Sequence, residues 1–390
     1  MFDPFSPMPT AERYAALADL RRTAPLARIA AGPWLAADMA SVLSGLKAVE
    51  HFAGSFGTTG TGPEDDQVMA AIPEPRHGKI RKIFNSALAY HHASRMESFA
   101  RAQAVQRLDA ARETCRRGGE VEAVEHWLAP IPSAVIAQVL GVPDADHARF
   151  ARWSDELLDR QGQSDHEHTG MADVHPEFAG YVDGLIEARR SGAAPPDDVI
   201  SRMLFTEIEG ERLSARMVRT QTMFLIIAGN ETTRNVIGNC VYRLASDLAL
   251  QDQIRRDAAL IPALIEETLR LDAPVQLLGR TCMRPLELEG IPIEEGDRVL
   301  FHLASANRDP AAFEEPDAFR LGRRNARDHV AFGAGAHVCP GAYLARMETR
   351  VVLETLLART EKIALAPGYT WDPNPVFWAL GPRTLRVTLQ

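Results

Sequence analysis

The chain has 390 residues, of which 24% are charged, and carries a formal net charge of −9 at pH 7. This acidic balance disfavours binding to nucleic acid, which needs a basic face, but it allows a local basic patch for an acidic protein partner. No linker, repeat or low-complexity tract divides the sequence, so we predict a single domain over residues 1–390.

The N-terminal residues Met1–Phe5 lack the basic start and the apolar core of a signal peptide. The longest strongly apolar stretch, Met223–Gly229, is too short to span a bilayer. The four cysteines lie far apart and form no CxxC pair, which argues against a zinc site. We therefore expect a monomer in the cytoplasm, with free thiols and without membrane contact.

Apolar residues recur at helical spacing over most of the chain. The predicted helices are Ala11–Arg22, Arg76–Leu88, Arg95–Arg117, Ala129–Leu140, Ala145–Leu158, Pro176–Arg190, Ser214–Leu248 and Ile261–Leu271. Alternation or β-branched content predicts strands at Arg284–Leu288, Arg298–His302 and Thr384–Leu389. The polar segment Ala306–Val330 should be ordered but irregular. The sequence thus predicts a mainly α fold with minor β.

The strongest motif is the segment Phe332–Gly341, Phe-Gly-Ala-Gly-Ala-His-Val-Cys-Pro-Gly. Its two alternating glycines allow a tight backbone turn against a flat ligand. Helix-forming residues follow Cys339, so its thiol is expected at a helix N-terminus, where N–H groups and the helix dipole favour the thiolate. A thiolate is what an electron-donating axial ligand of iron requires. An isolated cysteine, in contrast, is usually a small buried hydrophobe.

The complete pattern resembles the heme-binding loop of the cytochrome P-450 family, the heme-thiolate monooxygenases. The resemblance covers the chain from about His77 to Gly381. It implies a triangular domain with heme b between the long central helix and the helix after the cysteine. It also implies that Cys339 is the axial ligand and that Phe332 and Gly341 belong to the heme-binding loop.

One residue of this loop departs from many family members, which have a residue with an N–H group directly after the cysteine. Here that residue is Pro340, which has no N–H to donate. Hydrogen bonds to a ligand sulfur tune the reduction potential of the metal. We therefore hypothesise that the thiolate is more electron-rich than in those relatives.

A second motif interrupts the long central helix with the sequence Ala-Gly-Asn-Glu-Thr-Thr, residues 228–233. A glycine and a polar cluster are unfavourable within a helix, and such breaks are expected at functional sites. The resemblance implies that the helix opens here to leave a groove for dioxygen and water, and that Ala228 and Gly229 are cofactor-binding residues. It also matches the family's acid–alcohol pair, with Thr232 positioning dioxygen and Glu231 relaying protons. The alternative is a solvated polar stripe on an ordinary helix.

Four cationic or histidine side chains match the family's donors to the heme propionates. His77 and Arg81 lie one helical turn apart, Arg280 follows an apolar stretch, and His337 lies in the cysteine loop. Taken singly, each could be a surface charge. Glu267 and Arg270 resemble the family's structural ion pair, which either Arg320 or Arg323 could complete.

The resemblance also suggests where a substrate would bind and what could cover it. Apolar pocket segments would be Val68–Ile72, Phe224–Ala228, Val275–Leu278 and Phe377–Ala379. The stretches Phe56–Gly62 and Gln161–His175 could be lids or plain surface loops. The second contains His166, His168 and His175, for which a mobile solvent-facing loop is favoured over a metal site.

The resemblance therefore implies a monooxygenase that inserts one oxygen atom of dioxygen into a small apolar substrate, most simply by hydroxylation. The sequence has no flavin or iron–sulfur segment, so electrons are expected from a ferredoxin and a ferredoxin reductase. Two alternatives are a peroxide-driven heme-thiolate enzyme and a heme-binding sensor or carrier without turnover. The pair Glu231–Thr232 argues against both. The sequence does not identify the substrate or the position of attack.

Overall fold

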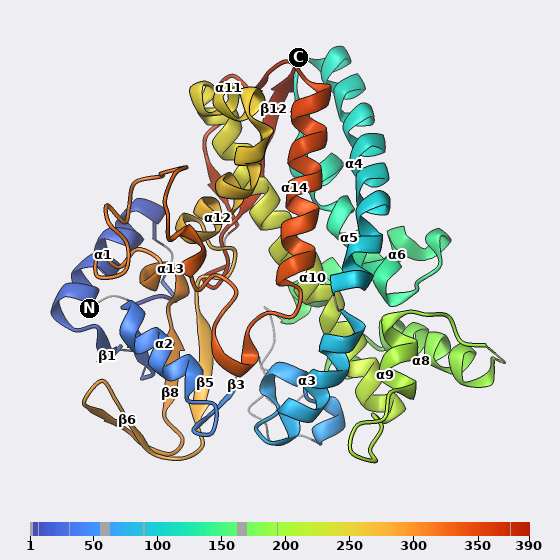
Figure 1. Ribbon diagram of the computed structural model, residues 1–390, viewed down its shortest axis with the longest axis vertical. Helices are drawn as coiled ribbons and strands as arrows, with labels where there is room; N and C mark the ends of the chain where they lie inside the picture. The colour runs from blue at the N-terminus through green and yellow to red at the C-terminus, as the bar shows by residue number, and fades with distance from the viewer. Residues whose placement is uncertain are drawn as a thin grey trace.

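The computed structural model describes residues 3–6, 8–30, 32–54, 63–88, 90–161, 170–192, 194–374 and 376–390. The predicted lid Phe56–Gly62 and the residues His166 and His168 lie outside this described part. The described chain is mainly helical with small sheets, as predicted (Figure 1).

The helices are α1 Thr10–Thr23, α2 Met39–Lys47, α3 Arg76–Ala87, α4 Tyr90–Gly118, α5 Pro130–Leu140, α6 His147–Gln161, α7 Met171–Val174, α8 Pro176–Ser191, α9 Val199–Phe205, α10 Ala215–Ser246, α11 Leu248–Arg256, α12 Ile261–Leu271, α13 Leu303–Ala306 and α14 Ala342–Arg359. The strands are β1 Leu26–Arg28, β2 Trp34–Ala36, β3 Phe52–Gly54, β4 Val121–Glu122, β5 Leu278–Cys282, β6 Leu286–Leu288, β7 Ile291–Ile293, β8 Arg298–Phe301, β9 Ile363–Leu365, β10 Asp372–Pro373, β11 Pro382–Thr384 and β12 Arg386–Leu389.

The largest sheet has the strand order β1-β2-β8-β5-β3, with β2 and β8 parallel and the other pairs antiparallel. Figure 1 shows this sheet with α1, α2 and α13 on one side of the molecule and most of the long helices on the other. One apolar cluster joins α4, α10, α12 and α14 into the helical core. Among the described residues, none of the helices combines the length and apolarity needed to cross a membrane.

The long predicted helix Ser214–Leu248 is two helices, so this prediction was wrong at its C-terminal end. Ser214 caps α10 by accepting a hydrogen bond from the N–H of Met217. At the other end, the Asp247 carboxylate accepts a hydrogen bond from Leu250 N and begins α11. A side chain that caps a new helix stops the old one, because its backbone leaves the helical conformation.

The C-terminal strand prediction Thr384–Leu389 is also corrected. Pro382–Thr384 pairs with β10, whereas Arg386–Leu389 pairs with β4 and β9. The chain therefore changes sheets at Leu385. In the same way α4 begins five residues before the predicted Arg95, and α6 begins at His147 after a short turn at Asp144–Asp146.

A buried ion network holds the irregular segment after β8 against α12. The carboxylate of Glu267 binds Arg270 with two contacts of 2.8 Å, and Arg323 Nε with contacts of 3.0 and 3.1 Å. Arg320 contributes only its backbone N–H to Glu267, at 3.0 Å, while its side chain binds the exposed Glu314 and Glu315. Arg323 is therefore the residue whose side chain completes the pair.

We predict that Arg323→Ala lowers the free energy of unfolding by about 3–5 kcal/mol, because removing one partner leaves a buried carboxylate poorly compensated. Arg320→Ala is the matched control and should change stability by less than about 1 kcal/mol, since an exposed ion pair contributes little. Denaturant unfolding of both variants measures this difference. Equal losses in the two variants would contradict the assignment.

Candidate functional site

The cysteine loop adopts the tight turn that its glycines allow. Gly333 and Gly335 have φ values of 72° and 70°, in the left-handed region that favours glycine. A Cβ atom at Gly335 would lie 2.7 Å from the backbone oxygen of Leu46, at the end of α2. The N–H of Cys339 donates to the oxygen of Phe332 over 2.9 Å and closes the loop.

The thiol of Cys339 lies just before α14, as predicted, and the N–H groups of Gly341 and Ala342 donate to it. Burial nevertheless raises the pKa of Cys339 above its ordinary value, because it outweighs these N–H groups and the charges of Arg81 and Arg346. The N–H groups at the helix N-terminus lower the pKa of Cys339, as expected, but burial has the larger effect. A metal bonded to the sulfur removes the proton outright.

An acid that sequence reasoning missed supports the loop from the side of α12. Glu266 accepts hydrogen bonds from Arg346 at 2.7 and 2.9 Å and lies 3.1 Å from His329 Nε2. Burial would raise its pKa, but His329 and Arg346 together lower it to about 2. The guanidinium of Arg346 lies 4.4 Å from the centroid of the Phe332 ring. Glu266 thus fixes the cation that packs against the cysteine loop.

The four predicted donors come together from three separate elements. His77 and Arg81 lie on α3, Arg280 on β5, and His337 in the cysteine loop, with the two imidazole rings stacked at 3.9 Å. Burial lowers the pKa of His77 and lowers that of Arg280 to about 10. Burial, followed by the charges of His77, Arg280 and Arg81, lowers the pKa of His337 to about 3.

The two arginines of this cluster have no anionic partner. Within the described ranges, neither Arg81 nor Arg280 forms an ion pair, although both are at least nine-tenths buried. The ring atoms His77 Nε2 and His337 Nδ1 are buried without hydrogen-bond partners. Buried charges and donors are costly unless they are paired. The cluster therefore fits a ligand that carries carboxylates, such as heme with its two propionates.

The central helix α10 carries a half-exposed stripe beside its many buried residues. Phe224, Ala228 and Thr232 are half-exposed and spaced by four residues, which places them on one face of the helix. The hydroxyl of Thr232 donates to the backbone oxygen of Ala228 over 2.7 Å. Gly229 lies against α5, since a Cβ atom there would be 3.2 Å from Ile136 Cγ1. That Gly229 also contacts the cofactor stays a prediction.

Glu231 is only 4% exposed, and its contacts lie on the side of α10 that leads toward the surface. Its carboxylate accepts a hydrogen bond from Asn374 Nδ2 over 2.9 Å, and Arg234 Nη2 lies 3.8 Å away. Arg234 also contacts the exposed Asp155 at 3.4 Å. A chain of polar groups therefore leads from solvent to the acid beside Thr232.

His175 was expected in a mobile solvent-facing loop, and this expectation was wrong. The side chain is 2% exposed, and its Nδ1 accepts a hydrogen bond from Phe178 N at the start of α8. Its Nε2 lies 2.9 Å from the carboxylate of Glu156 on α6. His175 is therefore a helix cap that ties α8 to α6.

Comparison with known proteins matches this arrangement to one family. The profile of the family described as Cytochrome P450 matches residues 39–363. A Bacillus spizizenii protein named Cytochrome P450 109 is 31% identical over 84% of this chain and 81% of its own length. A Mycolicibacterium smegmatis steroid C26-monooxygenase is 31% identical over 85% of this chain and 82% of its own.

A solved structure gives the same result for the fold. A cytochrome P450 from Bacillus megaterium, crystallised with testosterone, has a TM-score of 0.84 and 29% identity, covering 99% of each chain. The fold class predicted from the sequence is confirmed.

We predict that Pro340→Leu and Pro340→Ala both raise the iron reduction potential, because each restores a backbone N–H beside the sulfur and so withdraws electron density from it. Gly341 and Ala342 already donate to the thiol, so the added donor would be a third. Redox titration of the purified variants measures the change. An unchanged or lowered potential in both variants would contradict the hypothesis.

Proposed function

This chain belongs to the cytochrome P450 family of heme-thiolate monooxygenases, with Cys339 as the axial ligand, and we propose that it hydroxylates a small apolar substrate with dioxygen. When bound, the heme supplies the activation of dioxygen, while the protein supplies the ligand, the proton path and the pocket. The roles given below to the chain's own residues belong to this proposal.

In this proposal the buried cation cluster holds the heme carboxylates. His77, Arg81, Arg280 and His337 would donate to the two propionates, because they lie close together, are buried or half-buried, and include two arginines without an acidic partner. Phe332 and Gly341 would shape the loop under the ring, and Ala228 and Gly229 would border it from α10. The planar fork of an arginine suits a carboxylate particularly well.

The choice of reaction rests on Glu231, a buried carboxylate that adjoins Thr232 in the sequence and contacts Asn374 and the partly exposed Arg234. A carboxylate at that place can pass protons inward, and the Thr232 hydroxyl can hold a proton acceptor in position. A peroxide-driven enzyme needs no such relay, and neither does a sensor or carrier. The arrangement therefore supports turnover with dioxygen.

The substrate in this proposal is apolar and of the size of a steroid. Phe224 and Ala228 make the half-exposed stripe of α10 largely apolar. Leu277, Phe377 and Trp378, from two of the predicted pocket segments, belong to one apolar cluster. One relative is named a steroid C26-monooxygenase, and another protein of the same fold was crystallised with testosterone. These features support a steroid or a comparable apolar polycyclic compound.

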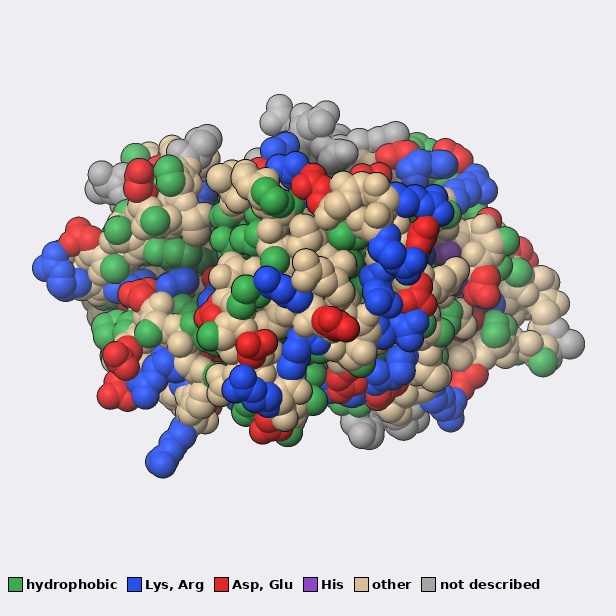
Figure 2. All heavy atoms as spheres, turned by 90° about the horizontal axis from the view of Figure 1, so that it is seen from above, with side chains coloured by type: hydrophobic (Ala, Val, Ile, Leu, Met, Phe, Trp, Pro, Cys, Tyr) green, Lys and Arg blue, Asp and Glu red, His purple; other side chains and the backbone are tan. Residues whose placement is uncertain are grey.

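Electrons would come from a ferredoxin that docks on the cysteine-loop face. This face is defined here by Lys47, Val338 and Tyr343, which are exposed, and the backbone of Lys47 lies against Gly335. Figure 2 shows Lys and Arg side chains gathered in a band, with acidic side chains among them, on the end of the molecule seen from above. Cations such as Arg117 and Arg359, near the ends of α4 and α14, are ion-paired, which leaves them less available to a partner. The proposal places the enzyme in the cytoplasm as a monomer.

We predict that Thr232→Val lowers product formation with dioxygen and electron donors by roughly a hundredfold, while electrons are lost to hydrogen peroxide. Thr222→Val is the matched control, because Thr222 lies on the same helix and its hydroxyl makes the same bond to the residue four before it. Product and peroxide are measured together. Equal behaviour of the two variants would contradict the role of Thr232.

The same assay separates the alternatives. A peroxide-driven enzyme would form product with peroxide alone and would tolerate Thr232→Val. A sensor or carrier would form no product under either condition. The proposal expects product with dioxygen and an electron donor, at a higher rate than with peroxide alone.

We predict that Lys47→Glu slows electron delivery from an acidic ferredoxin by roughly three- to tenfold at low salt, because a charge at the rim of an interface acts mainly on association. The effect should shrink as ionic strength rises. Lys362→Glu, an exposed lysine in the turn between α14 and β9, is the control and should have no effect. Stopped-flow reduction measures both. A salt-independent loss in both variants would contradict docking at this face.

A further inference from the structure

Glu74, which precedes α3, binds one of the proposed propionate donors. Its Oε1 lies 2.8 Å from His77 Nδ1, and its Oε2 accepts a hydrogen bond from Gly78 N over 3.0 Å. The side chain of His77 is 1% exposed, whereas that of Glu74 is 23% exposed. The bond to Gly78 fixes the carboxylate, so it points at the imidazole ring.

The contact with Glu74 determines which ring nitrogen of His77 carries a proton. A carboxylate accepts but does not donate, so His77 must donate to Glu74 from Nδ1. A neutral histidine has only one N–H group, which would leave a lone pair on Nε2. That Nε2 atom is buried and has no partner. It can donate to an anion only when both ring nitrogens carry a proton.

We propose that Glu74 is a positioning residue for the heme: its carboxylate keeps His77 doubly protonated, so that His77 donates to Glu74 from Nδ1 and to a heme carboxylate from Nε2. This rests on the proposed assignment of His77 to a propionate. Carboxylate–histidine pairs orient and tune the histidine in the same way beside metal ions.

The surroundings of His77 show why such a residue is needed. Burial lowers the pKa of His77, Glu74 raises it, and the neighbouring charges of Arg81 and Arg280 lower it again. The ring of His337 stacks on the other side at 3.9 Å and adds no negative charge. An arriving carboxylate and Glu74 would therefore flank the imidazolium from both ring nitrogens. Even with Glu74 present the pKa of His77 is lowered overall, so the second ring proton depends on Glu74 and the arriving carboxylate together.

Heme retention should then depend on pH in a defined direction. As pH rises through the pKa of His77 in the heme-loaded protein, Nε2 loses its proton and one hydrogen bond to the heme is lost. Heme release therefore becomes faster at higher pH. In Glu74→Gln protein, which lacks this negative charge, the pKa of His77 is lower, so heme release becomes faster from a lower pH onward.

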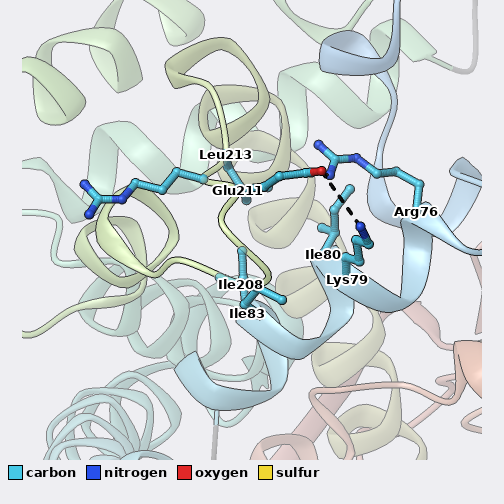
Figure 3. A pocket seen from close by; sticks show the side chains of 8 residues that line it. Arg76, Lys79, Ile80, Ile83, Ile208, Glu211 and Leu213 are labelled. Carbon is cyan, nitrogen blue, oxygen red and sulfur yellow. Dashed lines mark hydrogen bonds and ion pairs between the residues drawn. The ribbon is translucent and has the colours of Figure 1, made fainter.

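The opposite face of α3 offers a matched control. Figure 3 shows Lys79 and Arg76 beside Glu211, which lies on the turn before α10, in a shallow pocket lined by Ile80, Ile83 and Ile208. Glu211 binds both Arg76 and Lys79 and is 51% exposed. It is thus an acid that is paired with two cations of α3, outside the donor cluster.

The experiment measures transfer of heme from the loaded protein to an excess of apomyoglobin over roughly pH 6 to 9, the range in which histidine titrates. We expect Glu74→Gln to release heme about tenfold faster near neutral pH, because a charge-assisted hydrogen bond to the heme is lost. The pH at which its release begins to accelerate should be lower than in the native protein. Glu211→Gln should match the native protein.

A second background tests whether Glu74 acts through His77. In His77→Gln protein, the further change Glu74→Gln should leave the release rate and its pH profile unaltered. A normal heme-thiolate spectrum with native release rates in Glu74→Gln overturns this inference alone. So does an equal effect of Glu74→Gln with and without His77. A native protein that takes up no heme with a thiolate spectrum overturns the proposed function and this inference together.

Discussion

Uncompensated positive charge in the interior is the constraint on which the site depends. Arg81 and Arg280 are buried without an acidic partner in the described chain, and two histidine rings beside them have unpartnered nitrogens. An unpaired buried charge is costly, so an anion bound at the cluster would stabilise it. Three elements that are distant in the sequence, α3, β5 and the cysteine loop, converge on it. We interpret the convergence as a cradle for a dicarboxylate cofactor, which joins the sheet side of the molecule to the helical side.

The central helix α10 serves two environments at once. Its half-exposed stripe of Phe224, Ala228 and Thr232 is next to residues that are buried against α5 and the rest of the core. Glu231 is one residue from that stripe, yet its contacts lead outward, through Arg234 to the exposed Asp155. A single helical turn therefore connects an apolar interior with solvent. This is the arrangement that proton delivery into a dry pocket requires.

Much of the fold and the residue types of the site could be predicted from the sequence, because they are written in local patterns. Helical periodicity predicted both ends of the helix Ile261–Leu271 correctly, and the glycines before Cys339 predicted a tight loop. The break at Asp247 was missed, since an aspartate within an apolar period looks like a surface position. Glu266, Asn374 and Glu74 were missed for another reason: each acts through one contact, and nothing in a local pattern marks which Glu or Asn will make it.

The most direct measurement of the central claim compares the affinity of the heme-free protein for heme with its affinity for heme dimethyl ester, in which both carboxylates are neutral. If the buried cluster is a carboxylate cradle, the ester should bind at least about a hundredfold more weakly, because several charge-assisted hydrogen bonds are lost at once. The penalty should be smaller in Arg280→Leu protein, which lacks the more buried of the two unpaired arginines. Equal affinity for the two ligands in the native protein would contradict the account.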